Sequence, residues 1–131
     1  MKVRLVYTPS AIQEPLIAEI ILATRAKINI NRADIGAVSG EMIIDIPEDK
    51  YNQVVRMFRD KGLKVSLLHR PIVRDDNRCV MCGICTSICP IGAFKIEKDW
   101  SVTFEPEKCI QCGVCVSACP TSALELSEGE I

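Results

Sequence analysis

The chain reads Cys79-Val-Met-Cys82-Gly-Ile-Cys85-Thr-Ser-Ile-Cys89-Pro90 and, thirty residues later, Cys109-Ile-Gln-Cys112-Gly-Val-Cys115-Val-Ser-Ala-Cys119-Pro120. The two runs have four cysteines, a glycine, a serine and a proline in matching places, so they are copies of one internal repeat. Together they contain all eight cysteines of the 131-residue chain. No thiol is therefore left over for covalent chemistry, and we expect no catalytic residue in this chain.

The spacing C-x2-C-x2-C-x3-C-Pro is that of bacterial-type ferredoxins, which hold 4Fe–4S clusters. The first three cysteines of a run can curl around one cluster, whereas the fourth follows a longer gap and reaches the other cluster. Zinc needs only four ligands per site and does not explain a third cysteine and a Cys-Pro pair in each run. We therefore expect two 4Fe–4S clusters with crossed ligand sets, namely Cys79, Cys82, Cys85 and Cys119 for one and Cys109, Cys112, Cys115 and Cys89 for the other.

Charge divides the chain into two unlike halves. Residues 1–70 hold 11 Lys and Arg against 8 Asp and Glu, whereas residues 71–131 hold 5 against 9. Each oxidised cluster with its four thiolates adds about −2 to the second half. An acidic electron carrier docks well on a basic partner, although an excess of one sign also serves solubility. The net charge of −1 gives no case for nucleic-acid binding.

No stretch of the sequence has the features of an export signal or a membrane span. The basic residues Lys2 and Arg4 are not followed by an apolar core of the kind that signal peptides have. The most apolar stretch, residues 15–26, contains Glu19 and Arg25 and is far shorter than the roughly 20 residues of a spanning helix. These observations also disfavour a disulfide framework. We expect a cytoplasmic protein without membrane contact.

Residues 1–70 contain no cysteine and show alternating and helical periodicities. They predict strands at residues 2–7, 28–38 (with a bulge at Gly36), 41–46 and 63–67, and helices that begin at Pro15 and Pro47. Gly62 is expected to cap the second helix. The order βαββαβ predicts an α+β, ferredoxin-like and ACT-like sandwich. A core of this size makes a homodimer through this domain plausible.

We therefore expect an N-terminal domain at residues 1–70, a linker at 71–77 and a small two-cluster ferredoxin domain at 78–131. Within the last, residues 94–97 and 102–104 predict a hairpin. Trp100 stands at its turn, either as a docking residue or packed against the first domain.

Two resemblances cover nearly the whole chain. The last 54 residues resemble clostridial-type ferredoxins, on the two cysteine runs quoted above. The first 70 resemble the NIL domain, on Asn29-Ile-Asn-Arg-Ala-Asp-Ile-Gly36, Ser39-Gly-Glu-Met42, Ile46-Pro47 and the helix that ends at Gly62. The combination is similar to the family of iron–sulfur subunits of L-aspartate semialdehyde sulfurtransferase, which occurs in methanogens and other anaerobes.

The resemblance implies a low-potential electron carrier that supplies reductant for sulfur insertion into L-aspartate semialdehyde, giving homocysteine. A partner subunit would then carry the reactive cysteine. The alternative is a general ferredoxin whose NIL domain senses a sulfur amino acid, with Asn31, Gly36, Ser39 and Gly40 as the expected ligand surface. Glycine and serine at these positions also suit an ordinary turn. A third reading makes the NIL domain a purely structural docking module.

Overall fold

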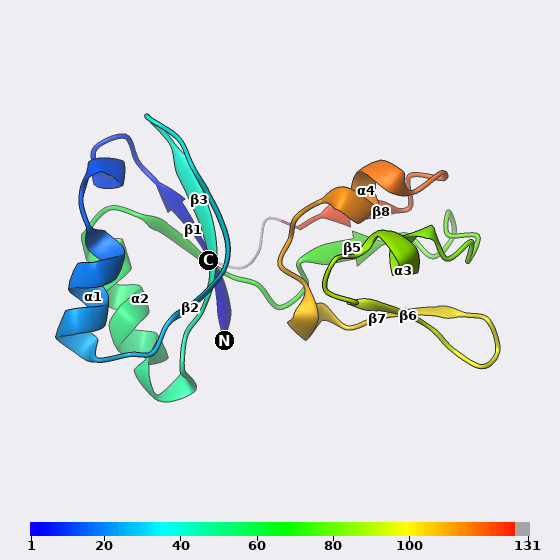
Figure 1. Cartoon of the computed structure of the whole chain (residues 1–131), viewed down its shortest axis with the longest axis horizontal. Helices are drawn as coiled ribbons and strands as arrows, with labels where there is room; N and C mark the ends of the chain where they lie inside the picture. Colours follow the sequence, from blue (N-terminus) through cyan, green and yellow to red (C-terminus); the bar gives the residue numbers. More distant parts are fainter. Residues whose placement is uncertain (128–131) are drawn as a thin grey trace. The chain divides into compact units, whose positions relative to one another are not determined.

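The computed structural model describes residues 1–127 and falls into two compact units, one from Met1 to Leu68 and one that begins at His69 (Figure 1). Both units mix short strands and helices, which confirms the predicted α+β class. Within residues 1–127, no helix is long and apolar enough to cross a membrane.

Unit 1 is a four-stranded antiparallel sheet with two helices. The strands lie in the order β2-β3-β1-β4. In chain order, the elements are β1 (Lys2–Tyr7), η1 (Ala11–Gln13), α1 (Leu16–Thr24), β2 (Asn29–Ile35), β3 (Gly40–Asp45), η2 (Glu48–Lys50), α2 (Tyr51–Asp60) and β4 (Lys64–Leu67). This is the predicted βαββαβ sandwich.

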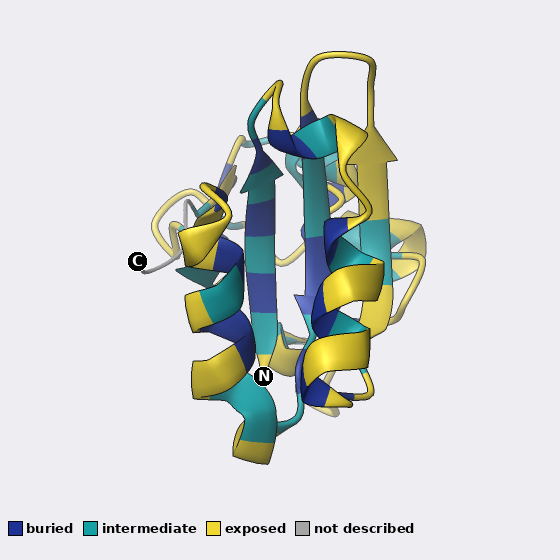
Figure 2. Cartoon of the chain, turned by 90° about the vertical axis from the view of Figure 1, so that its left-hand side faces the viewer, coloured by how far each residue is buried: buried dark blue, intermediate teal, exposed yellow. Residues whose placement is uncertain are grey.

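The core of unit 1 follows directly from the periodicity of its sequence. In β1, Val3, Leu5 and Tyr7 are buried, and the residues between them are less so, which gives the strand its banded colouring in Figure 2. The helices meet this face through their own apolar stripes, with Ile20 of α1 and Phe58 of α2 fully buried. The two-residue period of the strands and the 3.6-residue period of the helices therefore each place apolar side chains on the face that meets the shared core.

Helix α2 ends as the sequence predicts. Gly62 has a φ of +88°, and its N–H donates to Arg59 O at 3.0 Å while the N–H of Leu63 donates to Phe58 O at 3.2 Å. This pair of bonds is the Schellman motif, which a left-handed glycine closes without a clash of its side chain.

The hairpin between β2 and β3 differs from the prediction in two details. The strand ends at Ile35 instead of continuing to residue 38. The register shift lies between Ile30 and Arg32, not at Gly36. Gly36 instead opens the turn, where its N–H donates to Ser39 O at 2.8 Å. A turn satisfies this N–H as well as a strand partner would, which is why alternation alone extended the strand too far.

Unit 2 contains two short sheets and two short helices. In chain order, its elements are β5 (Ile72–Arg74), α3 (Ile84–Ile88), β6 (Phe94–Ile96), β7 (Val102–Phe104), η3 (Pro106–Lys108), α4 (Val114–Ala118) and β8 (Leu124–Leu126). Adding thirty to the numbers of β5, α3 and β6 gives those of β7, α4 and β8. The internal repeat is therefore larger than the cysteine runs.

Each sheet of unit 2 takes one strand from each repeat, since β5 pairs with β8 and β6 pairs with β7. The two registers correspond, with Ile72 opposite Leu126 in one sheet and Val102 opposite Ile96 in the other. The β6–β7 pair is the predicted hairpin. Strand β5, however, lies inside residues 71–77, which the sequence suggested to be a linker. Three residues are too few to show alternation, so only the partner strand reveals it.

Candidate metal centres

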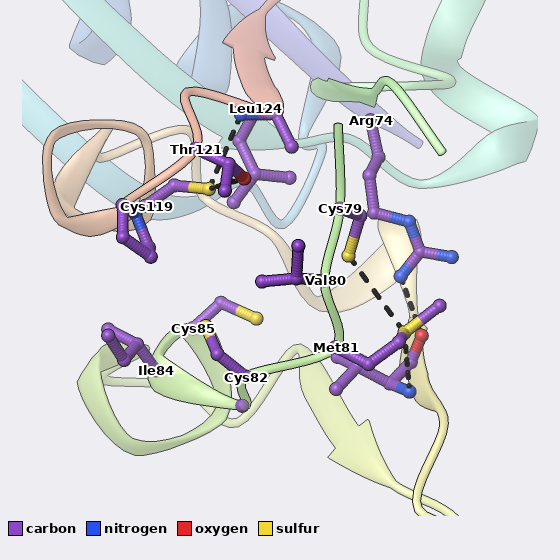
Figure 3. A pocket seen from close by; sticks show the side chains of 14 residues that line it. Arg74, Cys79, Val80, Met81, Cys82, Ile84, Cys85, Cys119, Thr121 and Leu124 are labelled. Atoms are coloured by element: carbon purple, nitrogen blue, oxygen red, sulfur yellow. Dashed lines mark hydrogen bonds between the residues drawn. The ribbon is translucent and has the colours of Figure 1, made fainter. Parts of the chain in front are cut away.

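The eight cysteines lie around two separate cavities in unit 2. Cavity A is lined by Cys79, Cys82, Cys85 and Cys119, together with residues that include Arg74, Met81 and Val102. Cavity B is lined by Cys89, Cys109, Cys112 and Cys115, together with Ile72, Phe94 and other apolar residues. Figure 3 shows the sulfur atoms of Cys79, Cys85 and Cys119 directed toward cavity A. The structure thus brings the eight predicted ligands together in two quartets, each with three cysteines from one repeat and one from the other.

The loops that carry the first three cysteines of each run have the same backbone conformation. Met81 and Gln111 have φ values of +54° and +56°, and Gly83 and Gly113 follow with +80° and +78°. Turns in which left-handed residues alternate with ordinary ones gather backbone N–H groups into a concave surface that binds anions. An iron–sulfur cluster with four thiolates is such an anion, so the loop geometry suits it.

Backbone N–H groups donate to the fourth cysteine of each run. The N–H of Ala93 donates to Cys89 Sγ at 3.3 Å, and the N–H of Ala123 donates to Cys119 Sγ at the same distance. The bond from Ala123 lowers the pKa of the Cys119 thiol. Each repeat therefore stabilises negative charge on the sulfur that reaches across to the other repeat's cavity.

The pKa of the third cysteine of each run, Cys85 or Cys115, changes in the opposite direction. Burial raises the pKa of the Cys115 thiol to about 11, and the nearby Cys109, Cys112 and Cys89 sulfurs add to the rise. Burial likewise raises the pKa of Cys85. These thiols lose their protons readily only when a metal ion replaces the proton on sulfur. Binding of iron is therefore coupled to proton release.

The donor set fits an iron–sulfur cluster. Soft thiolate ligands select zinc, copper(I) or iron–sulfur clusters among the metals of proteins, and each cavity offers four. Among residues 1–127, no three Cys, His, Asp or Glu side chains converge tightly enough to hold a single metal ion. The cysteines instead line two small cavities that are partly open to solvent.

The two cavities differ in burial and in anchoring. Cys109 and Cys115 of cavity B are buried, whereas no cysteine of cavity A is. The amide of Gln111 is buried and donates from Nε2 to the carbonyl oxygens of Pro71 and Ser127. Met81, its counterpart in the first repeat, is 41% exposed. The loop before Cys112 is thus held by two hydrogen bonds from a buried side chain, whereas in the loop before Cys82 the exposed Met81 accepts a hydrogen bond from the Val102 N–H at Sδ, 3.3 Å away.

Sequence patterns did not single out Arg74, which lines cavity A, or Gln111, which directly precedes the cavity B ligand Cys112. A signal for both was present in the thirty-residue offset, which places Gln111 opposite Met81 within the cysteine runs and, extended beyond them, places Arg74 opposite Phe104. Trp100 is 78% exposed at the tip of the β6–β7 hairpin, with a φ of +67°.

The residues suggested as a ligand surface in unit 1 do not all lie together. Gly36, Ser39 and Gly40 meet at the β2–β3 turn. Gly40 is buried, and a Cβ there would lie 2.7 Å from the side chain of Ile35, so close packing explains this glycine. Asn31 stands in β2, five residues before Gly36, about 17 Å along an extended strand.

Comparisons with known proteins match each unit separately. Residues 1–66 match the family described as the NIL domain. Residues 78–123 match the family described as the 4Fe-4S dicluster domain. The second match includes all eight cysteines.

Two relatives match along most of the chain, and both bear the name L-aspartate semialdehyde sulfurtransferase iron-sulfur subunit. The one from Methanosarcina acetivorans is 38% identical over 102 residues, which is 78% of this chain and 78% of the relative. The one from Methanocaldococcus jannaschii is 32% identical over 97 residues, 73% of this chain and 74% of the relative.

Proposed function

The chain belongs to the family of L-aspartate semialdehyde sulfurtransferase iron–sulfur subunits, and on this premise we propose that it supplies the electrons for sulfur insertion into L-aspartate semialdehyde. The observation that carries the proposal is the sorting of eight cysteines into two quartets, each around its own cavity. Each quartet has the donors for one 4Fe–4S cluster, and each cluster would carry one electron.

The chemistry explains the need for a pair of electrons. Conversion of an aldehyde and hydrogen sulfide into a thiol takes up two electrons and two protons and releases water. The aldehyde carbon is reduced, a carbon–sulfur bond forms and the carbonyl oxygen leaves as water. Two one-electron carriers in one small unit match this demand, while the protein around them sets their potentials.

The proposal also assigns a partner. A sulfur atom in transit is commonly held on a protein cysteine as a persulfide. The outer sulfur of a persulfide is two electrons more oxidised than sulfide, so such a donor raises the demand to four electrons, which the two clusters would deliver in two rounds of reduction. All eight cysteines of this chain lie at the two cavities, and with all of them ligating iron none would be free to carry sulfur. The reactive cysteine would therefore belong to a partner subunit, with both proteins in the cytoplasm.

An anaerobic reconstitution tests this division of labour. The holoprotein is loaded with iron and sulfide, and its iron content is measured before any assay. It is then supplied with aspartate semialdehyde, sulfide and a chemical reductant, with and without the catalytic subunit purified from the same cells. Homocysteine should form only in the complete mixture. Formation of homocysteine by this chain alone would sink the proposal.

The alternative, a general ferredoxin with an amino-acid sensor, predicts a ligand for unit 1. Calorimetry with methionine, homocysteine and cysteine addresses it directly. We expect no heat of binding, because packing and turn geometry already account for Gly36, Ser39 and Gly40. Binding that depends on Asn31 would favour the sensor.

A further inference from the structure

The two repeats of unit 2 differ in charge at one pair of corresponding positions, and one residue of that pair lines a cavity. Arg74 is the last residue of β5, and the thirty-residue offset places it opposite Phe104, the last residue of β7. The registers agree with this match. Arg74 pairs with Leu124 of β8, and Phe104 pairs with Phe94 of β6.

Arg74 brings a positive charge to cavity A. It is one of the residues that line the cavity, and Figure 3 draws it at the edge near Cys79. Its Nη1 donates to Val102 O at 2.6 Å, and Nε donates to Asp76 Oδ1 at 2.8 Å. The Arg74 side chain is only 25% exposed, whereas that of Asp76 is 77% exposed. Solvent screens the carboxylate more than the guanidinium, so the positive charge is offset only in part.

Cavity B has no such charge within the part of the chain that the structure describes. The ring of Phe104 packs against that of Phe94 with centroids 4.8 Å apart. Among residues 1–127, every residue that lines cavity B, apart from its four cysteines, is apolar. The inner cysteines there are also more deeply buried than those of cavity A.

The other charged side chains near the two cysteine runs do not create the same difference in charge between cavity A and cavity B. Arg78 lies 3.6 Å from Asp75, and Lys108 lies 2.6 Å from Glu105. These two ion pairs occupy equivalent positions, each just before the first cysteine of a run. Lys95 also contacts Glu105, but its side chain is half exposed and lines neither cavity. Among the described residues, Arg74 is therefore the charged side chain that lines one cavity and has no charged counterpart at the other.

We propose that Arg74 makes the cluster at cavity A the more readily reduced of the two. Each electron that a donor gives up adds one negative charge to a cluster. A guanidinium beside the cluster stabilises that added charge, whereas burial among apolar side chains disfavours it. Both effects act in the same direction and predict that the first electron resides at cavity A. This inference rests on the proposed binding of one 4Fe–4S cluster at each cavity.

The test is a redox titration of the anaerobically loaded full-length protein, with dithionite as the electron donor and electron paramagnetic resonance as the readout. Iron and sulfide content are measured first, so that a missing cluster is distinguished from a failed prediction. The wild type should show two separate one-electron steps. A single step with both clusters reduced at one potential would overturn the proposal without any variant.

Variants then isolate the charge. Arg74→Gln removes the charge and keeps an N–H donor at the position of Nε, which donates to Asp76, so the earlier step should shift to lower potential toward the later one. Arg74→Lys should leave the two steps apart. Lys98→Gln removes a positive charge from the exposed tip of the β6–β7 hairpin and should leave both steps in place. An equal shift in Arg74→Gln and Arg74→Lys, or an equal shift in Lys98→Gln, would contradict a local effect of the Arg74 charge.

Substitution of one cysteine ligand at each cavity assigns the two reduction steps to the two cavities. Serine can replace one thiolate, and it alters the resonance of the cluster that it holds. Cys82→Ser should change the signal of the earlier step, and Cys112→Ser that of the later one. The reverse assignment would place the more readily reduced cluster at cavity B and overturn the inference.

Discussion

Unit 1 and unit 2 are of similar size but depend on different interiors. Unit 1 buries branched and aromatic side chains such as Leu5, Ile20 and Phe58 between a sheet and two helices. Unit 2 has strands of three residues and helices of five, and it counts Cys109 and Cys115 among its few buried residues. A polypeptide can form the first interior alone, whereas the second is completed by a metal cluster. The two units should therefore respond differently to the same perturbation.

Removal of the clusters should give the largest difference. Acid or a chelator under air strips iron from the protein, and unit 2 then loses the ligand bonds that join its loops. We expect amide hydrogen exchange in residues 72–127 to become fast, while exchange in the strands of unit 1 stays slow. Mass spectrometry of peptides from holoprotein and stripped protein measures both units in one sample. Persistent protection of β5 and β8 in the stripped protein would show that unit 2 folds without metal.

Glycines in the left-handed region should give a smaller contrast. Nothing lies within 4 Å of a Cβ built on Gly62 or on Gly92, so a substitution there changes only the backbone energy. Gly62→Ala should lower the free energy of unfolding of unit 1 by about 1–2 kcal/mol, and Gly62→Asn by less. Gly92→Ser should leave the cluster content unchanged, because Ser122 holds the same conformation in the other repeat, with a φ of +53°.

Denaturant titration followed by circular dichroism measures the Gly62 variants, and the visible absorbance per protein measures the Gly92 variant. Equal stability of Gly62→Ala and wild type would mean that the end of α2 adapts to the new residue. Loss of clusters in Gly92→Ser would mean that the repeats are less alike than their backbones suggest.

The smallest effect concerns pH and is confined to unit 1. Burial tends to raise the pKa of Glu41, but hydrogen bonds from Arg4 and Arg32 outweigh it and leave the pKa below its ordinary value of 4.5. A carboxylate with a lowered pKa stabilises the fold above the unfolded-state pKa, and this contribution disappears as the pH falls through the folded-state value. Glu41→Gln should therefore destabilise unit 1 at neutral pH by about 1 kcal/mol or less.

Urea midpoints at neutral pH and in acid measure this effect, with the exposed Glu48→Gln as a matched control. The difference between Glu41→Gln and wild type should vanish in acid, because the wild-type carboxylate is then protonated too. A constant difference at both pH values would point to packing instead of charge.

Much of unit 1 could be predicted from its sequence, because the alternation in β1 and the apolar stripe of α2 each identify the residues that face the core. Gly62 also correctly predicted where α2 ends. The cysteine runs likewise predicted two quartets, and the structure places the eight residues around two cavities. What alternation could not give was the limit of β2, because a turn and a strand satisfy the N–H of Gly36 equally well.

Strand β5 and its last residue show where local patterns end. Ile72, Val73 and Arg74 acquire their strand structure from β8, fifty or more residues away, and no window of neighbouring sequence contains that partner. Arg74 reads as a linker residue until the pairing sets it at a cavity. Only the comparison of one repeat with the other could have singled it out in advance.

The exchange of strands and fourth cysteines between the repeats also bears on ancestry. A polypeptide with a single copy of the repeat could complete its sheets and cysteine quartets only by pairing with an identical molecule, and both sites would then carry the same side chain at every position. Joining two copies in one chain releases them from that identity. Arginine at 74 and phenylalanine at 104 record such a release, since symmetry can be broken only after duplication.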